Sequence, residues 1–104
     1  MSILSITFHT PNHLFEDWEY FIKNSLEKMV EDLIQVEQFI LSEVESDMLQ
    51  EGKNTNLLLI FDDENLREEF VKSEFENLQY HVEKEFGEEV MVFKTYLNER
   101  KTRI

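Results

Sequence analysis

The sequence predicts a single α+β domain whose secondary structure follows the order β-α-β-β-α-β. Apolar and polar residues alternate along Ile3–His9, as in a strand with one buried face, whereas two longer segments repeat apolar residues at helical spacing. Another segment, Thr55–Phe61, ends in five consecutive apolar residues, which predicts a strand that is apolar on both faces. A chain of 104 residues has room for one core, which we expect to span residues 1–97, followed by a short basic tail at residues 98–104.

A stop signal separates the first strand from the first helix. One face of the strand carries Leu4, Ile6 and Phe8, and the other carries Ser5, Thr7 and His9. Pro11 and Asn12 then end the strand, and Asn12 is expected to cap a helix whose first turn is acidic. Apolar residues recur at helical spacing from Leu14 to Leu33, which predicts an amphipathic helix of about five or six turns.

Two strands are predicted in the middle of the chain. The second strand is expected at Gln38–Glu45, and the polar segment Asp47–Asn54 is expected to connect it to the third strand at Thr55–Phe61. In the third strand the alternation places Leu57, Leu59 and Phe61 on one face and Leu58 and Ile60 on the other. Both faces of this strand therefore need to be removed from water.

The second helix is predicted to begin at the acidic run Asp62–Glu64, which suits the positive end of a helix dipole. Its apolar stripe starts at Leu66 and Phe70 and then rotates, which predicts a bend or a helix that touches two surfaces. Gly87 stands where a helix C-cap is expected, and Val90–Leu97 is predicted as the fourth strand.

This order of elements is the split βαβ or ferredoxin-like arrangement, a four-stranded antiparallel sheet with both helices on one face. The first and third strands are central in that topology. The uncovered face would then expose a large apolar patch, which soluble monomers rarely tolerate. We therefore expect two sheets to pack face to face in a homodimer, a dimeric α/β-barrel. The residues predicted at this interface are Leu58, Ile60, Met91 and Phe93.

Composition and charge argue against several classes of partner. The chain has 23 acidic and 10 basic residues, a net charge of −13 that disfavours binding to nucleic acid or to anionic membranes. The basic side chains near the C-terminus are expected to fray or to dock on an acidic surface. No apolar run approaches the ~20 residues needed to span a bilayer, and the opening residues do not resemble a signal peptide. The chain has no cysteine, so we expect a cytoplasmic protein without disulfides.

The closing segment, Phe86-Gly87-Glu88-Glu89-Val90-Met91-Val92-Phe93-Lys94-Thr95-Tyr96-Leu97, resembles the end of a family of short bacterial proteins of unknown function. Members of that family usually end Phe-Gly-x-x-Val-x-x-Phe-Arg-Thr-x-Leu. Trp18, following a short first strand, also resembles the family pattern. The resemblance implies a ferredoxin-like, dimeric α/β-barrel fold and no particular activity. This chain departs from the pattern at Lys94, where the family has Arg, and it lacks the His-Ile-Pro that the family commonly carries in the first helix.

Histidine at the end of the first strand suggests a place for chemistry. Ser5, Thr7 and His9 form a polar stripe, and an aromatic residue near it would complete a pocket. The residues predicted to line this candidate ligand pocket are Ser5, Thr7, His9, Trp18, Phe70 and Tyr96. The competing interpretation is that the stripe lies at an interface or at the rim of the sheet.

Other kinds of site have little support in the sequence. Neither the acidic run Asp62–Glu64 nor the pair Glu43 and Glu45 has the spacing of a metal site, and the two glycines do not form a phosphate-binding loop. We therefore predict no metal site and no cofactor.

Two classes of function remain open. The first is a non-enzymatic homodimer that binds a small molecule or a partner protein. The second, suggested by fold analogy alone, is a small oxidative or isomerising enzyme of the monooxygenase-like dimeric α/β-barrel type, with a pocket between helices and sheet. A closed cavity with convergent polar groups would favour the enzyme, and a filled core would favour the interaction module.

Overall fold

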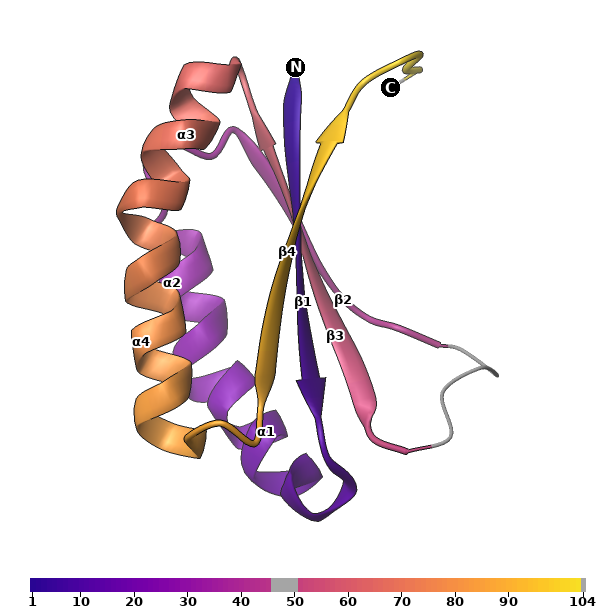
Figure 1. The fold of residues 1–104 in the computed structure, drawn as a ribbon, viewed down its shortest axis with the longest axis vertical. Helices are drawn as coiled ribbons and strands as arrows, with labels where there is room; N and C mark the ends of the chain where they lie inside the picture. Colours follow the sequence, from indigo (N-terminus) through magenta and orange to yellow (C-terminus); the bar gives the residue numbers. More distant parts are fainter. Residues whose placement is uncertain (46–50, 104) are drawn as a thin grey trace.

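The elements of the computed structural model, which describes residues 1–45 and 51–103, follow the predicted order (Figure 1). The strands are β1 (Ser2–Thr10), β2 (Gln38–Glu43), β3 (Lys53–Phe61) and β4 (Met91–Asn98). The first helical segment comprises η1 (Asn12–Leu14), α1 (Phe15–Phe21), the π-helical η2 (Ile22–Leu26) and α2 (Glu27–Glu31). The second comprises α3 (Glu64–Lys72) and α4 (Glu74–Phe86). Residues 47–50 of the predicted connection Asp47–Asn54 lie outside the described residues, and its last two residues, Lys53 and Asn54, belong to β3.

The four strands form one antiparallel sheet in the order β2-β3-β1-β4, so the two predicted central strands are central. The register places Ile3 between Ile60 of β3 and Leu97 of β4, and His9 between Asn54 and Met91. Because side chains alternate along a strand, this register fixes which residues of all four strands share a face. The ferredoxin-like α+β fold is confirmed.

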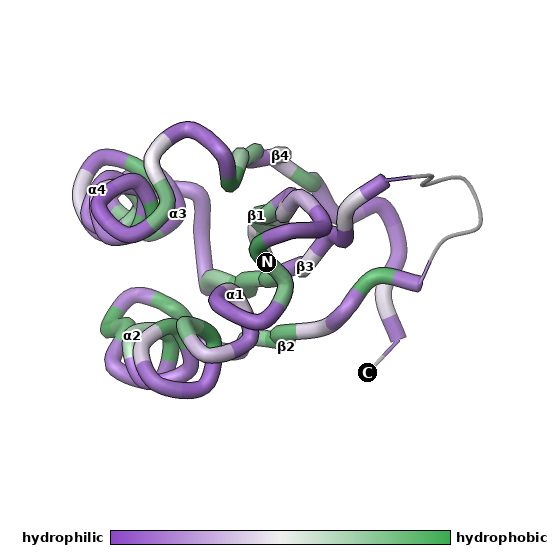
Figure 2. The backbone as a smooth tube through the Cα atoms, turned by 90° about the horizontal axis from the view of Figure 1, so that it is seen from below, coloured by the Kyte–Doolittle hydropathy of each residue, from purple (hydrophilic) through white to green (hydrophobic). Residues whose placement is uncertain are grey.

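All helices cover the same face of the sheet, and Figure 2 shows them on one side of it. The core lies between the helices and the sheet. Its β1 and β3 side chains are the ones predicted for a buried face, and each is fully inaccessible to solvent: Leu4, Ile6, Phe8, Leu57, Leu59 and Phe61. The helices supply aromatic side chains that pack on them, with Trp18 next to Phe8 and Phe70 next to Phe61. The opposite face of the sheet has no covering layer within the described residues.

The first helix differs from the prediction at its start. Asn12 does not cap it, because its side-chain Oδ1 accepts a hydrogen bond from the backbone N–H of Gly52 at 2.9 Å. A 3-10 turn, closed by the N–H of Leu14 and the carbonyl of Pro11, precedes α1 instead. Asn12 thus ties the end of β1 to the start of β3.

The second helix is interrupted at Ser73, which confirms the predicted bend. Ser73 has φ −125° and ψ −76°, outside the helical region, and its hydroxyl donates to the carbonyl of Glu69 at 2.7 Å. The break lets Phe70 and Phe75 both reach the core from different directions. Gly87 ends α4 with φ 62° and ψ −139°, a conformation that favours glycine, so the predicted C-cap is also confirmed.

An arginine, Arg67, lies buried at one end of the sheet, although no sequence pattern predicts its burial. Its Nη1 donates to the carbonyls of Ile3 and Leu97 at 3.0 and 3.2 Å, and both Nη atoms contact Oδ1 of Asn98. The guanidinium also lies 5.1 Å from the centre of the Tyr96 ring. Arg67 therefore fastens α3 to the β1–β4 pair through backbone carbonyls instead of through an acid.

Removal of the α3 cap should destabilise the fold. The Asp63 side chain accepts a hydrogen bond from the N–H of Leu66 at 3.0 Å, and Asp63→Ala should lower the free energy of unfolding by about 1 kcal/mol. In a domain of this size that is a fall in Tm of roughly 4–8 °C, measurable by circular dichroism.

Asp62→Ala is the matched control. The Asp62 carboxyl, through a hydrogen bond and its charge, raises the pKa of Glu37, so its removal relieves a repulsion and should not lower Tm. Equal losses in the two variants would contradict the capping role of Asp63.

Candidate functional site

The open face of the sheet is the first candidate surface. The register places all four residues predicted at the dimer interface on it, together with the predicted polar stripe. Its members from the paired strand positions are Ile3, Ser5, Thr7, His9, Gln38, Ile40, Ser42, Asn54, Asn56, Leu58, Ile60, Met91, Phe93, Thr95 and Leu97. We refer to this set as the open face.

The open face carries no Asp, Glu, Lys or Arg at any of these paired positions. Charged residues make up 32% of the sequence, so their exclusion from one face of all four strands is a consistent feature of the sheet. Charged side chains of the strands point to the helix side instead. Lys94 lies over the Phe75 ring, and Lys53 lies over the Phe15 ring and within 3.6 Å of Glu43.

Large apolar side chains are exposed on the open face. Ile40, Met91, Phe93 and Leu97 are between 40% and 55% exposed, and Ile3, Leu58 and Ile60 are half-buried. Met91 and Phe93 lie on the edge strand β4, next to His9 and Thr7 of β1. Exposed apolar areas on soluble proteins are commonly interaction surfaces, which makes the open face a candidate site.

Hydrogen bonds pair the polar side chains of the open face with one another. Asn56 Nδ2 donates to Ser5 Oγ at 2.7 Å, with a longer contact to Thr7 Oγ1 at 3.4 Å. His9 Nδ1 lies 2.7 Å from Oδ1 of Asn54, a contact in which the ring N–H donates to the amide oxygen when Nδ1 carries the proton. These groups already have partners, which lowers the cost of taking them out of water.

The six residues predicted to line one pocket lie on two faces of the sheet. Ser5, Thr7 and His9 are on the open face, whereas Trp18 and Phe70 are core residues on the helix side. Trp18 Nε1 donates to Thr55 Oγ1 at 3.0 Å and is fully committed to the core. Tyr96 is also on the helix side, beside Arg67. The sheet separates the two groups, so no single cavity can collect all six.

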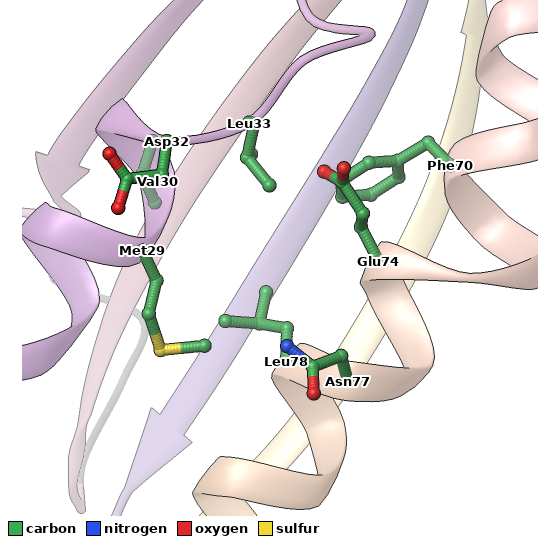
Figure 3. Close-up of a pocket in the computed structure, with 8 residues that line it drawn as sticks. All are labelled: Met29, Val30, Asp32, Leu33, Phe70, Glu74, Asn77 and Leu78. Carbon is green, nitrogen blue, oxygen red and sulfur yellow. The ribbon is translucent and has the colours of Figure 1, made fainter.

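A crevice between the end of α2 and the α3–α4 junction is the second candidate site (Figure 3). Its volume is about 280 Å³, close to the lower limit of roughly 300–1,000 Å³ that is typical of ligand pockets. Residues from the end of α2 face residues from the α3–α4 junction across it. They are Met29, Val30, Asp32, Leu33, Phe70, Glu74, Asn77 and Leu78.

Glu74 is the polar group that distinguishes this crevice. A backbone hydrogen bond from Ile34 favours the ionised form of its carboxyl, while Oε2 is buried and has no hydrogen-bond partner among the described residues. Burial raises the pKa of the Glu74 carboxyl above its ordinary value of 4.5, against the smaller opposing effect of the Ile34 hydrogen bond. In Figure 3 the side chain reaches from α4 toward the end of α2, whereas the Asp32 carboxylate points away from the other lining side chains.

Sequence reasoning missed Glu74 and both asparagines of the open face. Glu74 looked like one more acid in an acidic helix, and only the break at Ser73 turns it toward α2. Asn54 and Asn56 had a usable signal, because they continue the alternation of β3 opposite Thr7 and His9.

The remaining titratable candidates form surface contacts. His13 Nε2 lies 3.3 Å from Glu89 on an exposed part of the surface, and Asp63 serves as the cap of α3. No group of three potential metal ligands comes together within residues 1–45 and 51–103. In the same ranges, no helix has both the length and the apolar character needed to cross a bilayer.

Comparison with known proteins gives one family and a set of fold relatives. The model of a family described as a domain of unknown function (DUF4286) matches residues 1–100, in agreement with the resemblance of the closing segment. No curated protein matches the sequence.

Three solved structures illustrate the fold relatives. An ethyl tert-butyl ether d (EthD) family protein from Bacillus halodurans has a TM-score of 0.69 at 10% identity, over 91% of this chain and 97% of that one. HapK from Hahella chejuensis has a TM-score of 0.68 at 10% identity, over 100% and 97%. A putative antibiotic biosynthesis monooxygenase from Deinococcus radiodurans has a TM-score of 0.61 at 8% identity, over 100% and 99%. At such identities the likeness extends to the fold alone.

The substitution Glu74→Gln should stabilise the protein at neutral pH. A carboxyl whose pKa is raised on folding weakens the folded state once it ionises, so stability is lost as the pH rises through the folded pKa. The amide keeps an acceptor for Ile34 and carries no charge. We expect a gain of about 0.5 kcal/mol at pH 7, because solvent still reaches part of the side chain.

Thermal melts over a pH series measure this effect. Its size should shrink as the pH falls toward 4.5, because the raised pKa lets Glu74 become protonated in the wild-type fold at a higher pH than an ordinary glutamate. Glu76→Gln, an exposed acid in the same first turn of α4, should show no comparable gain. A gain that is independent of pH would contradict the assignment to ionised Glu74.

Proposed function

We propose that this chain, which belongs to the family described as a domain of unknown function (DUF4286), is an interaction module that forms a homodimer through the open face of its sheet. The observation that supports the proposal is the complete lack of charged side chains over the paired positions of that face, in a protein of net charge −13. Its exposed apolar side chains supply the driving force for association.

Charge argues for a second copy as the occupant of the open face. Two molecules of net charge −13 repel each other, and they can approach closely only where neither presents a like charge. A basic partner, in contrast, would be bound by acidic side chains, which the open face does not offer at its paired positions. A neutral, partly apolar face matches another face of the same kind.

The polar centre of the open face is compatible with burial in such a dimer. Asn56 Nδ2 is paired with Ser5 Oγ and His9 Nδ1 with Asn54 Oδ1, so face-to-face packing would bury these four polar atoms as pairs. Apolar residues flank this centre on both sides, with Met91 and Phe93 on β4 and Leu58 on β3. A two-fold axis through the sheet would then bring the apolar flanks of each copy together.

We rank the oxidative or isomerising enzyme below the interaction module. The six residues that would have lined its pocket are divided between the two faces of the sheet. The space between helices and sheet is filled by aromatic side chains, with Trp18 in contact with Phe8, Phe21 and Phe86. A catalytic proposal would need convergent polar groups in that space.

Phe93→Glu should convert the dimer into a monomer. Phe93 is half exposed on an edge strand, so the substitution leaves the core intact, while face-to-face packing would bring two new like charges into the interface. Analytical ultracentrifugation over a concentration series measures the shift, which we expect to weaken association by at least about 100-fold.

Tyr80→Glu is the matched control, because it places the same charge on an exposed aromatic position of α4, away from the sheet. It should leave the dimer unchanged. Raising the salt concentration from about 50 to 500 mM should strengthen wild-type association by screening the repulsion between acidic surfaces. A wild-type protein that stays monomeric at high concentration would refute the proposal.

A further inference from the structure

We propose that the crevice between α2 and the α3–α4 junction binds a small organic cation, a primary amine with an alkyl or aryl body whose ammonium group pairs with Glu74. This site lies on the helix side of the molecule, and it neither uses nor requires the open face. Its failure and the failure of the dimer are therefore separate outcomes.

The walls of the crevice are suited to the apolar body of such a ligand. Met29 and Leu33 line it from the α2 end, and Phe70 of α3 and Leu78 of α4 line it from the opposite side. Phe70 is fully buried and Leu78 nearly so, which makes this side a rigid apolar surface. Met29 is unbranched and adapts readily to ligands of different shape.

The Glu74 carboxylate supplies the recognition of charge. The backbone N–H of Ile34 favours the ionised form of this carboxyl and so acts against the effect of burial on its pKa. One oxygen, Oε2, is buried with no hydrogen-bond partner within residues 1–45 and 51–103. A buried acceptor of this kind needs a donor, and a charged donor forms the stronger bond.

The sign of the ligand follows from the charges around the crevice. Both charged side chains in its lining, Asp32 and Glu74, are acids, so an anionic ligand would be repelled. The net charge of −13 also raises the local concentration of small cations. A neutral alcohol would fill the same space but would lack the ion pair, and an amine is therefore favoured over it.

Nuclear magnetic resonance titration of ¹⁵N-labelled protein tests the proposal with 2-phenylethylamine as the probe. We expect saturable shifts at Ile34, Glu74 and Leu78, with a dissociation constant on the order of 1 mM. The neutral 2-phenylethanol and the anionic 3-phenylpropanoate, which match its aryl body, should bind at least about tenfold more weakly.

Two variants make the result specific. Glu74→Gln should weaken amine binding by about tenfold and leave the alcohol unaffected, whereas Glu76→Gln should change neither. Phe93→Glu, altered only on the open face, should bind the amine as wild type does. Equal affinity for amine and alcohol, or no saturable shift around the crevice, would overturn the proposal. Shifts that spread over the acidic surface and persist in Glu74→Gln would also overturn it, as nonspecific attraction of a cation.

Discussion

The antiparallel pairing of β1 with β3 is the constraint from which the rest of the molecule follows. Each residue of β1 has a fixed partner in β3, and paired residues lie on the same face. The alternation of side chains therefore assigns the residues of both strands to one face or the other. The face that holds Ile6 and Leu57 becomes the floor of the core, and the face that holds Thr7 and Asn56 becomes the open face. A shift of one residue would exchange these roles, and the same shift in β4 would turn charged Lys94 to the open face in place of Phe93. The register is thus fixed by burial on one side and by neutrality on the other.

The fold was predictable because its signals are periodic and local. Alternation along β1 and helical spacing after Pro11 each specify an element without reference to the rest of the chain. The doubly apolar strand at Leu57–Phe61 also identified the centre of the sheet. The same alternation selected Leu58, Ile60, Met91 and Phe93 as neighbours on one surface, and the register places them there.

The sites were less predictable, because they depend on contacts between distant segments. Asn12 has the sequence context of a helix cap, yet Gly52, far along the chain, offers its side chain a better-placed N–H. In the sequence Arg67 looks like a solvated helix residue. The pairing of β1 with β4 supplies the backbone carbonyls that accept its hydrogen bonds and so make its burial possible. The predicted pocket failed for a related reason. Its members were chosen by chemical type, and their separation by the sheet could be seen only from the register.

The placement of charge unites the two candidate sites. The acidic residues crowd the helices and loops, and the strands turn their few charged side chains to the helix side, so the open face stays neutral. Strong negative charge elsewhere opposes random association, which leaves the open face as the surface where two copies can meet. The same negative charge makes the helix side attractive to cations, and Oε2 of Glu74, which lines the crevice, is a buried acceptor without a hydrogen-bond partner in the described part of the chain. One charge distribution therefore separates the surface suited to self-association from the surface suited to a small ligand, and the sheet and core lie between them.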